Sequence, residues 1–263
     1  MMNYKNKLIR TFSSAASDYD QEAELQRQVA TDLVDLFFKT TVTDSFRDDF
    51  YPSLDLGSGT GFILKQLKKQ IGFTLINLDI SFGMLKHLQN QFTQASCICA
   101  DADKLPFKEG QFKLIFSSLM LQWSTKLEET LDEINRILAQ SGLFVFSTLG
   151  PHSLSQLRQS WFLIDQRPHV HDFIDKETLI SFLEKKFQLI LFLEKTYTLY
   201  YPDAMQAMLH LKKLGVTYRK LDQGTKLLGK QALKRVIEHY EQFRIEDKGV
   251  PLHYHVFFGI VKK

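Results

Sequence analysis

The stretch Leu54-Asp55-Leu56-Gly57-Ser58-Gly59-Thr60-Gly61-Phe62 decides the fold of this chain. It runs from an apolar strand pattern into a helix pattern, with three alternate glycines at the turn. Glycine lets the backbone turn tightly and approach a ligand without a clashing Cβ. A dinucleotide-binding loop has its third glycine one residue later, so this spacing disfavours an NAD-dependent oxidoreductase. Taken alone, the loop is weak evidence, because a plain strand-to-helix turn is the alternative.

Strand and helix patterns alternate after this loop. Apolar residues at helical spacing predict a helical region over 10–38, before the first strand. Strands are predicted at 53–56, 73–79, 96–100, 112–117 and 143–149, with helices at 62–69, 82–92 and 126–139 between them. This alternation is typical of βαβ units and predicts a parallel sheet. Two more strands are predicted at 188–201 and 253–261, and helices at 154–165, 176–185 and within 204–243.

Composition limits the classes of protein to which the chain belongs. Lys and Arg total 33 against 30 Asp and Glu, a formal charge of 33 − 30 = +3, which is too mild to indicate a nucleic-acid partner. The first residues lead into a polar helix pattern, so we expect neither a signal peptide nor a membrane anchor, and a cytoplasmic protein. Cys97 and Cys99 are expected to be buried thiols. The pairs His169/His171 and His253/His255 are not expected to hold a metal.

Two further strand ends carry residues suited to a nucleoside. Asp79 ends the second strand, where its carboxylate could accept hydrogen bonds from both hydroxyls of a ribose, although it could equally cap the next helix. Ile80 and Met84 would supply apolar faces for an adenine, although core packing is their commoner role. Asp101 and Ala102 end the third strand, placed for the amino group and a ring nitrogen of adenine. Open α/β sheets bind ligands at this edge.

This order of motifs resembles the class I methyltransferases throughout residues 53–149. The resemblance implies a Rossmann-like α/β fold with a seven-stranded, mostly parallel sheet, an antiparallel last strand and helical lid insertions. It implies S-adenosylmethionine as cofactor, S-adenosylhomocysteine as product and no metal. The cofactor-binding residues would be Asp55, Gly57, Ser58, Gly59, Gly61, Asp79, Ile80, Met84, Asp101, Ala102 and Leu119.

The expected domain organisation is a single methyltransferase domain, 1–263. A chain of 263 residues with 44% hydrophobic content suits one elaborated α/β domain. Its parts would be a helical N-terminal preface (1–50), the cofactor-binding core (53–149), two helical lid insertions (150–186 and 203–250) and the last strand (253–263).

Outside the cofactor motifs the chain resembles a narrower family, the malonyl-[acyl-carrier protein] O-methyltransferases of biotin synthesis, known as the BioC family. The resemblance covers nearly the whole chain. One departure is Ser58, where this family commonly has Cys; both are small. The matching segments are 12–20, 25–27, 105–107, 117–123, 153–154, 167–169, 211–215 and 254–259.

The family resemblance implies transfer of a methyl group to the free carboxylate of malonyl-[acyl-carrier protein]. The resulting ester would pass through fatty-acid elongation towards pimelate. A carboxylate is already ionised near pH 7 and a sulfonium is an excellent methyl donor, so no general base is required.

Five residues are the candidates for positioning the substrate. Tyr19 could close over the cofactor or position the substrate, or be a surface anchor. Gln122 and Trp123 follow the fourth strand at the ligand edge, where the amide and the indole N–H could meet the substrate, although Trp123 could simply pack. Arg167 and His169 lie in the first lid insertion, and the Arg167 fork suits a malonyl carboxylate, with a surface ion pair as the alternative.

Carrier proteins are acidic, so a basic surface is expected near the site. The candidates, which could also be solvated helix faces, are Lys212, Lys213, Lys230, Lys234 and Arg235. Two other functions stay open. A methyltransferase for a small free acid such as trans-aconitate would share the cofactor motifs but not need this surface. A non-catalytic S-adenosylmethionine-binding protein would bind the cofactor without transferring the methyl group.

Overall fold

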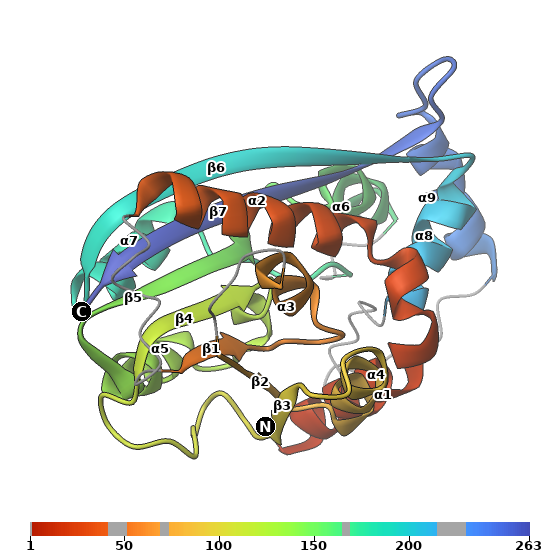
Figure 1. The fold of residues 1–263 in the computed structure, drawn as a ribbon. Coiled ribbons are helices and arrows are strands. Elements are labelled where there is room, and N and C mark those ends of the chain that lie inside the picture. Colours follow the sequence, from red (N-terminus) through yellow and green to blue (C-terminus); the bar gives the residue numbers. More distant parts are fainter. Residues whose placement is uncertain (1, 42–51, 69–73, 165–168, 215–229) are drawn as a thin grey trace.

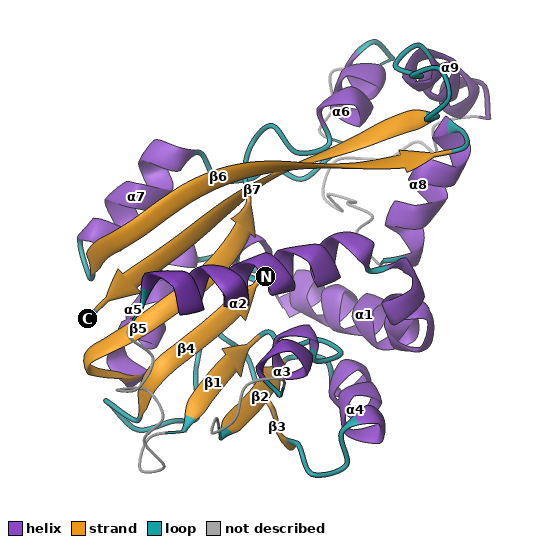
Figure 2. Ribbon diagram, turned by 45° about the horizontal axis from the view of Figure 1, so that its top comes forward, coloured by secondary structure: helices purple, strands orange, loops and turns teal. Residues whose placement is uncertain are grey.

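The computed structural model describes residues 2–41, 52–68, 74–164, 169–214 and 230–263. Its centre is a seven-stranded sheet in the order β3-β2-β1-β4-β5-β7-β6 (Figure 2). β1 to β5 run parallel, and β7 is antiparallel to both β5 and β6. The predicted α/β fold class is therefore confirmed. The strands are β1 (Ser53–Leu56), β2 (Leu75–Asp79), β3 (Ser96–Cys99), β4 (Phe112–Ser118), β5 (Leu138–Leu149), β6 (Gln188–Tyr201) and β7 (Val250–Lys262).

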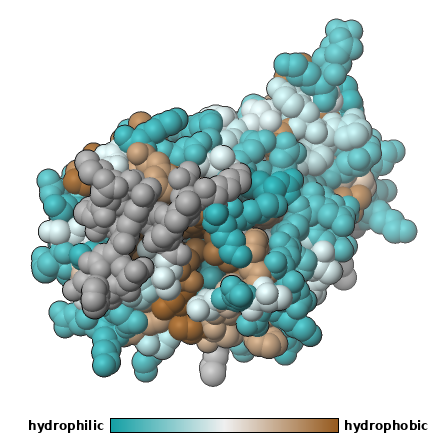
Figure 3. All heavy atoms as spheres, viewed as in Figure 1, coloured by the Kyte–Doolittle hydropathy of each residue, from teal (hydrophilic) through white to brown (hydrophobic). Residues whose placement is uncertain are grey.

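Helices cover both faces of the sheet and enclose a hydrophobic core on each. One core packs α2 and α3 against the sheet, and α2 crosses in front of the strands in Figure 1. The other core packs α5 and α7 against the opposite face. The face seen in Figure 3 is mainly hydrophilic with scattered apolar patches, as expected when the apolar residues fill the two cores. The helices are α1 (Met2–Glu22), α2 (Glu24–Thr40), α3 (Phe62–Leu67), α4 (Phe82–Gln91), α5 (Leu127–Ile137), α6 (Ser155–Phe162), α7 (Lys176–Glu184), α8 (Ala204–Lys213) and α9 (Lys230–Glu241).

The helical N-terminal preface consists of two helices, α1 and α2, which pack against different parts of the fold. The chain breaks at Ala23, whose ψ of 48° is not helical. α2 carries the predicted apolar stripe, and its Leu33 and Phe37 are fully buried. α1 instead packs on α4 at the ligand edge of the sheet, where the Ser13 and Ser81 hydroxyls are 2.9 Å apart. The preface therefore supplies a wall of the ligand edge as well as a cover for the sheet.

Some element boundaries differ from the sequence prediction, because pairing with a distant strand decides where the element begins or ends. α5 ends at Ile137 rather than at residue 139, because Leu138 is extended and pairs with Phe112 of β4. β7 begins at Val250 rather than at residue 253, because β6 is long enough to pair with it from there. The expectation of two buried thiols is wrong: Cys99 is exposed and Cys97 half-buried, since β3 is an edge strand.

Within the described ranges, no helix has the length and apolar character needed to cross a bilayer.

The packing of α1 on α4 gives a stability prediction at Gly83. A Cβ at Gly83 would stand 2.7 Å from the Ser13 Cα, too close for either backbone to tolerate. We expect Gly83→Ala to lower the free energy of unfolding by about 1–3 kcal/mol, because α1 must move away. Urea denaturation measures the change.

Asn90→Ala is the matched control, since Asn90 is exposed on the same helix and Ala is a good helix former. It should be neutral or slightly stabilising. A Gly83→Ala protein as stable as its parent would contradict the close packing of the two helices.

Candidate active site

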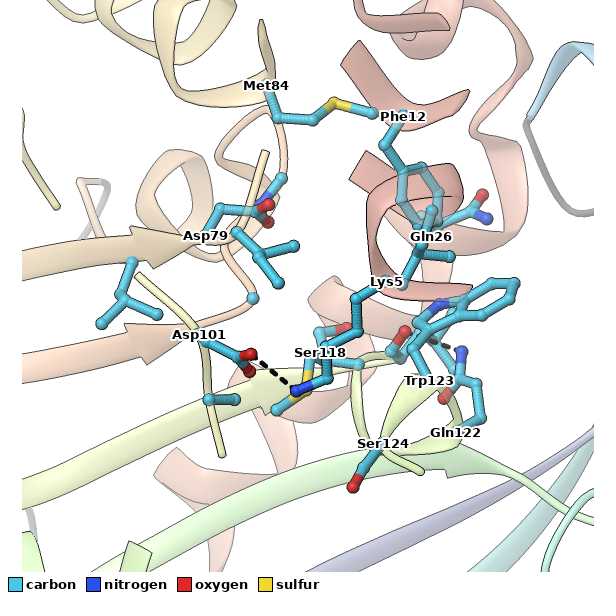
Figure 4. A pocket seen from close by; sticks show the side chains of 18 of the residues that line it. Lys5, Phe12, Gln26, Asp79, Met84, Asp101, Ser118, Gln122, Trp123 and Ser124 are labelled. Atoms are coloured by element: carbon cyan, nitrogen blue, oxygen red, sulfur yellow. Dashed lines mark hydrogen bonds and ion pairs between the residues drawn. The ribbon is translucent and has the colours of Figure 1, made fainter. Parts of the chain in front are cut away.

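A cavity lies at the carboxyl ends of the parallel strands, beside β1, on whose two sides lie β2 and β4. This is the position where open α/β sheets bind ligands. Its walls come from α1, the glycine loop, the ends of β2 to β5 and β7. Figure 4 shows Asp79 and Asp101 on the strand side, with Lys5 and Phe12 reaching in from α1.

The glycine loop has the backbone shape that only glycine adopts readily. Gly57, Gly59 and Gly61 have φ of 78°, 53° and 94°, in the left-handed region. A Cβ at Gly57 would overlap the Met120 side chain, whereas one at Gly59 would meet nothing within 4 Å. Gly57 and Gly59 line the cavity. Ser58, in contrast, is buried away from it.

Asp79 joins the glycine loop to the start of α4. Its two carboxylate oxygens accept hydrogen bonds from the backbone N–H groups of Gly59, at 2.9 Å, and Ser81, at 2.7 Å. Ser81 is the residue that caps α4, since its hydroxyl accepts from the N–H of Met84. Burial raises the pKa of Asp79, and these backbone donors offset part of the rise. Each oxygen keeps a lone pair that a ribose hydroxyl can use.

The part of the cavity where the sequence predicted adenine is apolar with one charged cluster. Ile80, Met84 and Ala102 line it. Lys5 of α1 lies 2.6 Å from Asp101 and also contacts Asp103 (Figure 4). Burial alone would lower the pKa of Lys5, but hydrogen bonds to the two carboxylates and their charges raise it. Lys5 could not be recognised as a cavity residue from local sequence patterns, because its partners lie 96 and 98 residues away.

Asp55 lies beneath the glycine loop, outside the lining of the cavity. It is 1% exposed, and neither carboxylate oxygen has a hydrogen-bond partner among the described residues. Burial, together with the nearby charge of Asp79, raises the pKa of Asp55 to about 8. A cationic ligand above this carboxyl would offset the cost of ionising it. S-adenosylmethionine, which carries a sulfonium and an ammonium group, fits that requirement.

The other end of the cavity presents neutral polar groups among aromatic rings. Gln122 donates from its side-chain amide to the Leu119 carbonyl at 2.6 Å, and its Oε1 accepts from Thr148 at 3.2 Å. The amide therefore has a fixed orientation. Trp123 packs edge-on against Phe12, with ring centroids 5.4 Å apart.

Tyr19 and Leu119 also line this cavity. Tyr19 packs edge-on against Phe12, with 6.5 Å between ring centroids. Burial raises the pKa of Tyr19, and the charges of Asp79 and Asp20 add to the rise, so its phenol is a neutral donor. Leu119 has a φ of 51° and its N–H donates to the Ser147 carbonyl, which brings the Leu119 backbone to the cavity.

Arg167 and His169, the two candidates of the first lid insertion, have different outcomes in the structure. Arg167 lies outside the described residues. His169 does not line the cavity, and its ring stacks on Trp161 with centroids 4.0 Å apart. The neighbouring His171 is the one near Trp123, with 6.1 Å between the ring centroids, and burial lowers the pKa of His171.

The basic candidates differ in their surroundings. Lys213 is 2.6 Å from Glu22, at the end of α1, and Lys212 beside it is exposed. Leu214, next along the chain, lines the cavity. Lys234 is 3.8 Å from Glu238 on α9, where Lys230 and Arg235 are also exposed.

Comparison with solved structures identifies the class of the fold. A SAM-dependent methyltransferase from Thermotoga maritima superposes with a TM-score of 0.54 and 14% identity, covering 96% of this chain and 98% of that one. The YcgJ protein from Bacillus subtilis gives a TM-score of 0.56 at 14% identity, over 81% and 92% of the two chains. A family model described as a methyltransferase domain matches residues 54–146. The chain has the class I methyltransferase fold, and its cofactor is S-adenosylmethionine.

Sequence comparison identifies the family. The malonyl-[acyl-carrier protein] O-methyltransferase of Gallionella capsiferriformans is 32% identical over 97% of this chain and 89% of its own length. The corresponding protein of Halorhodospira halophila is 32% identical over 95% and 85%. The biotin biosynthesis bifunctional protein BioHC of Cellvibrio japonicus is 34% identical over 98% of this chain, which spans only 50% of that relative. The chain belongs to the malonyl-[acyl-carrier protein] O-methyltransferase family.

The position of Asp79 predicts a loss of cofactor affinity on substitution. In Asp79→Asn an amide N–H₂ must face one of the two backbone donors, and the ribose loses a charged acceptor. We expect the dissociation constant for S-adenosylhomocysteine to rise about 10- to 100-fold. Isothermal titration calorimetry measures it, with Asp172→Asn on the exposed surface as control. Unchanged affinity would exclude Asp79 from the cofactor site.

The raised pKa of Asp55 predicts a pH dependence of stability. The pKa of Asp55 is about 8 in the folded protein, whereas its usual value is 3.8. The contribution of Asp55 to the free energy of unfolding is therefore complete below about pH 4 and is lost as the pH rises toward 8. Asp55→Asn should remove this contribution. Urea unfolding at pH 5 and pH 8 should therefore show a smaller decrease for the variant than for the parent. Equal decreases would mean that Asp55 ionises normally in the folded protein.

Proposed function

We propose that this protein catalyses S-adenosylmethionine-dependent O-methylation of the free carboxylate of malonyl-[acyl-carrier protein], giving the methyl ester that enters pimelate and biotin synthesis. The observation that carries the proposal is the joining, in one cavity, of a cofactor edge to a substrate end formed by Gln122, Trp123 and Tyr19. The names of the near full-length relatives support the choice of substrate.

The chemistry needs no proton transfer. A malonyl carboxylate is ionised near pH 7 and attacks as it stands. Its oxygen forms a bond to the methyl carbon while the carbon–sulfur bond breaks and the electron pair goes to sulfur. S-adenosylmethionine supplies that electrophilic methyl group when bound. A negative and a positive charge both disappear in the reaction. A cavity without water therefore destabilises the charged reactants more than the transition state, which lowers the barrier.

The residues at the substrate end would align the reactants and exclude water. The Gln122 amide, held by the Leu119 carbonyl and Thr148, is ready to orient an acyl oxygen. Phe12 of α1 and Trp123 of the turn after β4 both line the cavity and pack against each other. Alignment of this kind can contribute on the order of 7–11 kcal/mol to the barrier reduction.

We place the docking of the acidic carrier protein at the last turn of α8. Lys212 and Lys213 precede Leu214, which lines the cavity, so a carrier bound there has its prosthetic arm close to the entrance. Lys213 is already engaged by Glu22, so Lys212 is the better candidate for a new ion pair. Lys230, Lys234 and Arg235 on α9 are the alternative surface.

The proposal predicts a strong preference for the carrier-bound substrate. With labelled S-adenosylmethionine, kcat/KM for malonyl-[acyl-carrier protein] should exceed the values for malonyl-CoA and malonate by about tenfold or more, because only the carrier adds the protein interface. Mass spectrometry should place the methyl group on the carboxylate oxygen. Equal rates with all three substrates would favour a small-acid methyltransferase. Cofactor binding without transfer to any of them would favour a non-catalytic role.

Lys212→Glu tests the docking surface within the same assay. It should lower kcat/KM for the carrier substrate about 3- to 10-fold and leave malonyl-CoA unaffected. The matched control is Lys108→Glu. Lys108 is exposed and precedes the amino end of β4, whereas the cavity lies at the carboxyl ends of the strands. An equal effect of both substitutions would remove α8 from consideration.

A further inference from the structure

Tyr254 is a residue of the cavity that the sequence motifs did not single out as a site residue. It lies on β7, opposite Tyr197 of β6, and is 3% exposed. It lines the cavity together with Leu149 and Leu214, from the end of β5 and of α8. Its hydroxyl has no hydrogen-bond partner among the described residues.

An orphaned hydroxyl at this position is costly unless something bound satisfies it. Leaving a buried donor without a partner destabilises a protein, and phenylalanine would fill the same space without that cost. Other buried tyrosines of the fold satisfy their hydroxyls: Tyr240 donates to the Pro251 carbonyl at 3.0 Å, and Tyr197 donates to Asp32. Among the described tyrosines with little exposure, Tyr254 therefore combines an unmet donor with a place on the cavity wall.

The chemistry of the surroundings indicates an anionic or carbonyl oxygen as the missing partner. Burial raises the pKa of Tyr254 well above its usual value, and the phenols of Tyr201, Tyr240 and Tyr19 add to the rise, so it is a neutral donor. The cation among the described lining residues is Lys5, which is committed to Asp101 and Asp103 at the adenine end. Neutral donors are thus what the described substrate end offers.

We propose that the Tyr254 hydroxyl donates a hydrogen bond to the substrate carboxylate, on the oxygen that does not receive the methyl group, with Tyr19 as the neighbouring donor from α1. This rests on the proposed function and names the group that recognises the acid. A neutral donor orients the carboxylate without holding its charge as an arginine would. Because the charge disappears in the transition state, a strong ion pair would stabilise the reactant more than the transition state.

The test compares carriers that differ only in the carboxylate. S-adenosylhomocysteine-loaded protein, which cannot react, is titrated with malonyl- and acetyl-[acyl-carrier protein]. The parent protein should bind the malonyl form about 10- to 100-fold more tightly. Tyr254→Phe should lose most of that preference and lower kcat/KM for malonyl-[acyl-carrier protein] by a similar factor, with S-adenosylhomocysteine affinity changed less than about twofold.

Tyr240→Phe is the matched control, because it removes a buried hydroxyl from the same part of the fold but outside the cavity lining. It should keep the malonyl preference while its melting temperature falls. Tyr254→Phe should fold as stably as the parent or more so, since it loses no hydrogen bond within the protein. Loss of stability in Tyr254→Phe without loss of preference would reduce the residue to a structural role.

The outcomes separate this inference from the function on which it rests. Parent protein that binds malonyl and acetyl carriers equally, or Tyr254→Phe that keeps the preference, overturns the role of Tyr254 even if methylation occurs. Weaker binding of S-adenosylhomocysteine by Tyr254→Phe would mean that the hydroxyl contacts the cofactor, and would also overturn the proposed role of Tyr254 in carboxylate binding. Parent protein that never methylates malonyl-[acyl-carrier protein] overturns the proposed function instead.

Discussion

The carboxylate of Asp79 links the glycine loop to the start of α4 beside the cavity. One oxygen holds the N–H of Gly59 and so fixes the glycine loop; the other holds the N–H of Ser81 and so fixes the start of α4. Ser81 in turn meets Ser13 and caps α4. This chain of contacts helps to position α1, and with it the wall that carries Phe12 and Tyr19, together with the ion pair of Lys5 with Asp101. An acidic side chain at a strand end thus connects the glycine loop, α4 and α1.

The separation of charged and neutral groups within the cavity follows the chemistry expected of it. Charged side chains gather at one part of the cavity: Asp79, Asp101 and Lys5 line it, and the buried Asp55 lies outside the lining. The substrate end carries an amide, an indole and phenols. Ionised donors there would bind the substrate better than the transition state, since the reaction removes charge. In the proposed reaction, the charged side chains of the cavity therefore lie apart from the neutral donors that would meet the acid.

The sequence predicted the parts of this site that depend on local patterns. Alternating strand and helix patterns predicted the sheet. The glycine spacing, with Asp79 and Asp101 at strand ends, predicted residues that line one cavity, because they lie at the carboxyl ends of adjacent strands. Lys5 was not predicted, since only the break at Ala23 turns α1 back toward the sheet. The same holds for the ends of α5 and β7, where pairing with distant strands decides the boundary.

Tyr254 could be matched to a family segment but not given a role from the sequence. In a fully buried strand both faces are apolar, and whether an inward hydroxyl meets a partner depends on residues from other elements. His169 and His171 show a related limit: both belong to one irregular stretch, and the backbone alone decides which ring approaches Trp123.

The position of β7 in the sheet bears on how the protein is made on the ribosome. Tyr19 emerges early in synthesis, and the cofactor edge of β1 to β5 can pair as soon as those strands leave the exit tunnel. β7 then inserts between β5 and β6 and brings Tyr254 to the cavity wall. The nascent chain can therefore form the glycine loop and the strand ends beside it before Tyr254 completes the cavity wall.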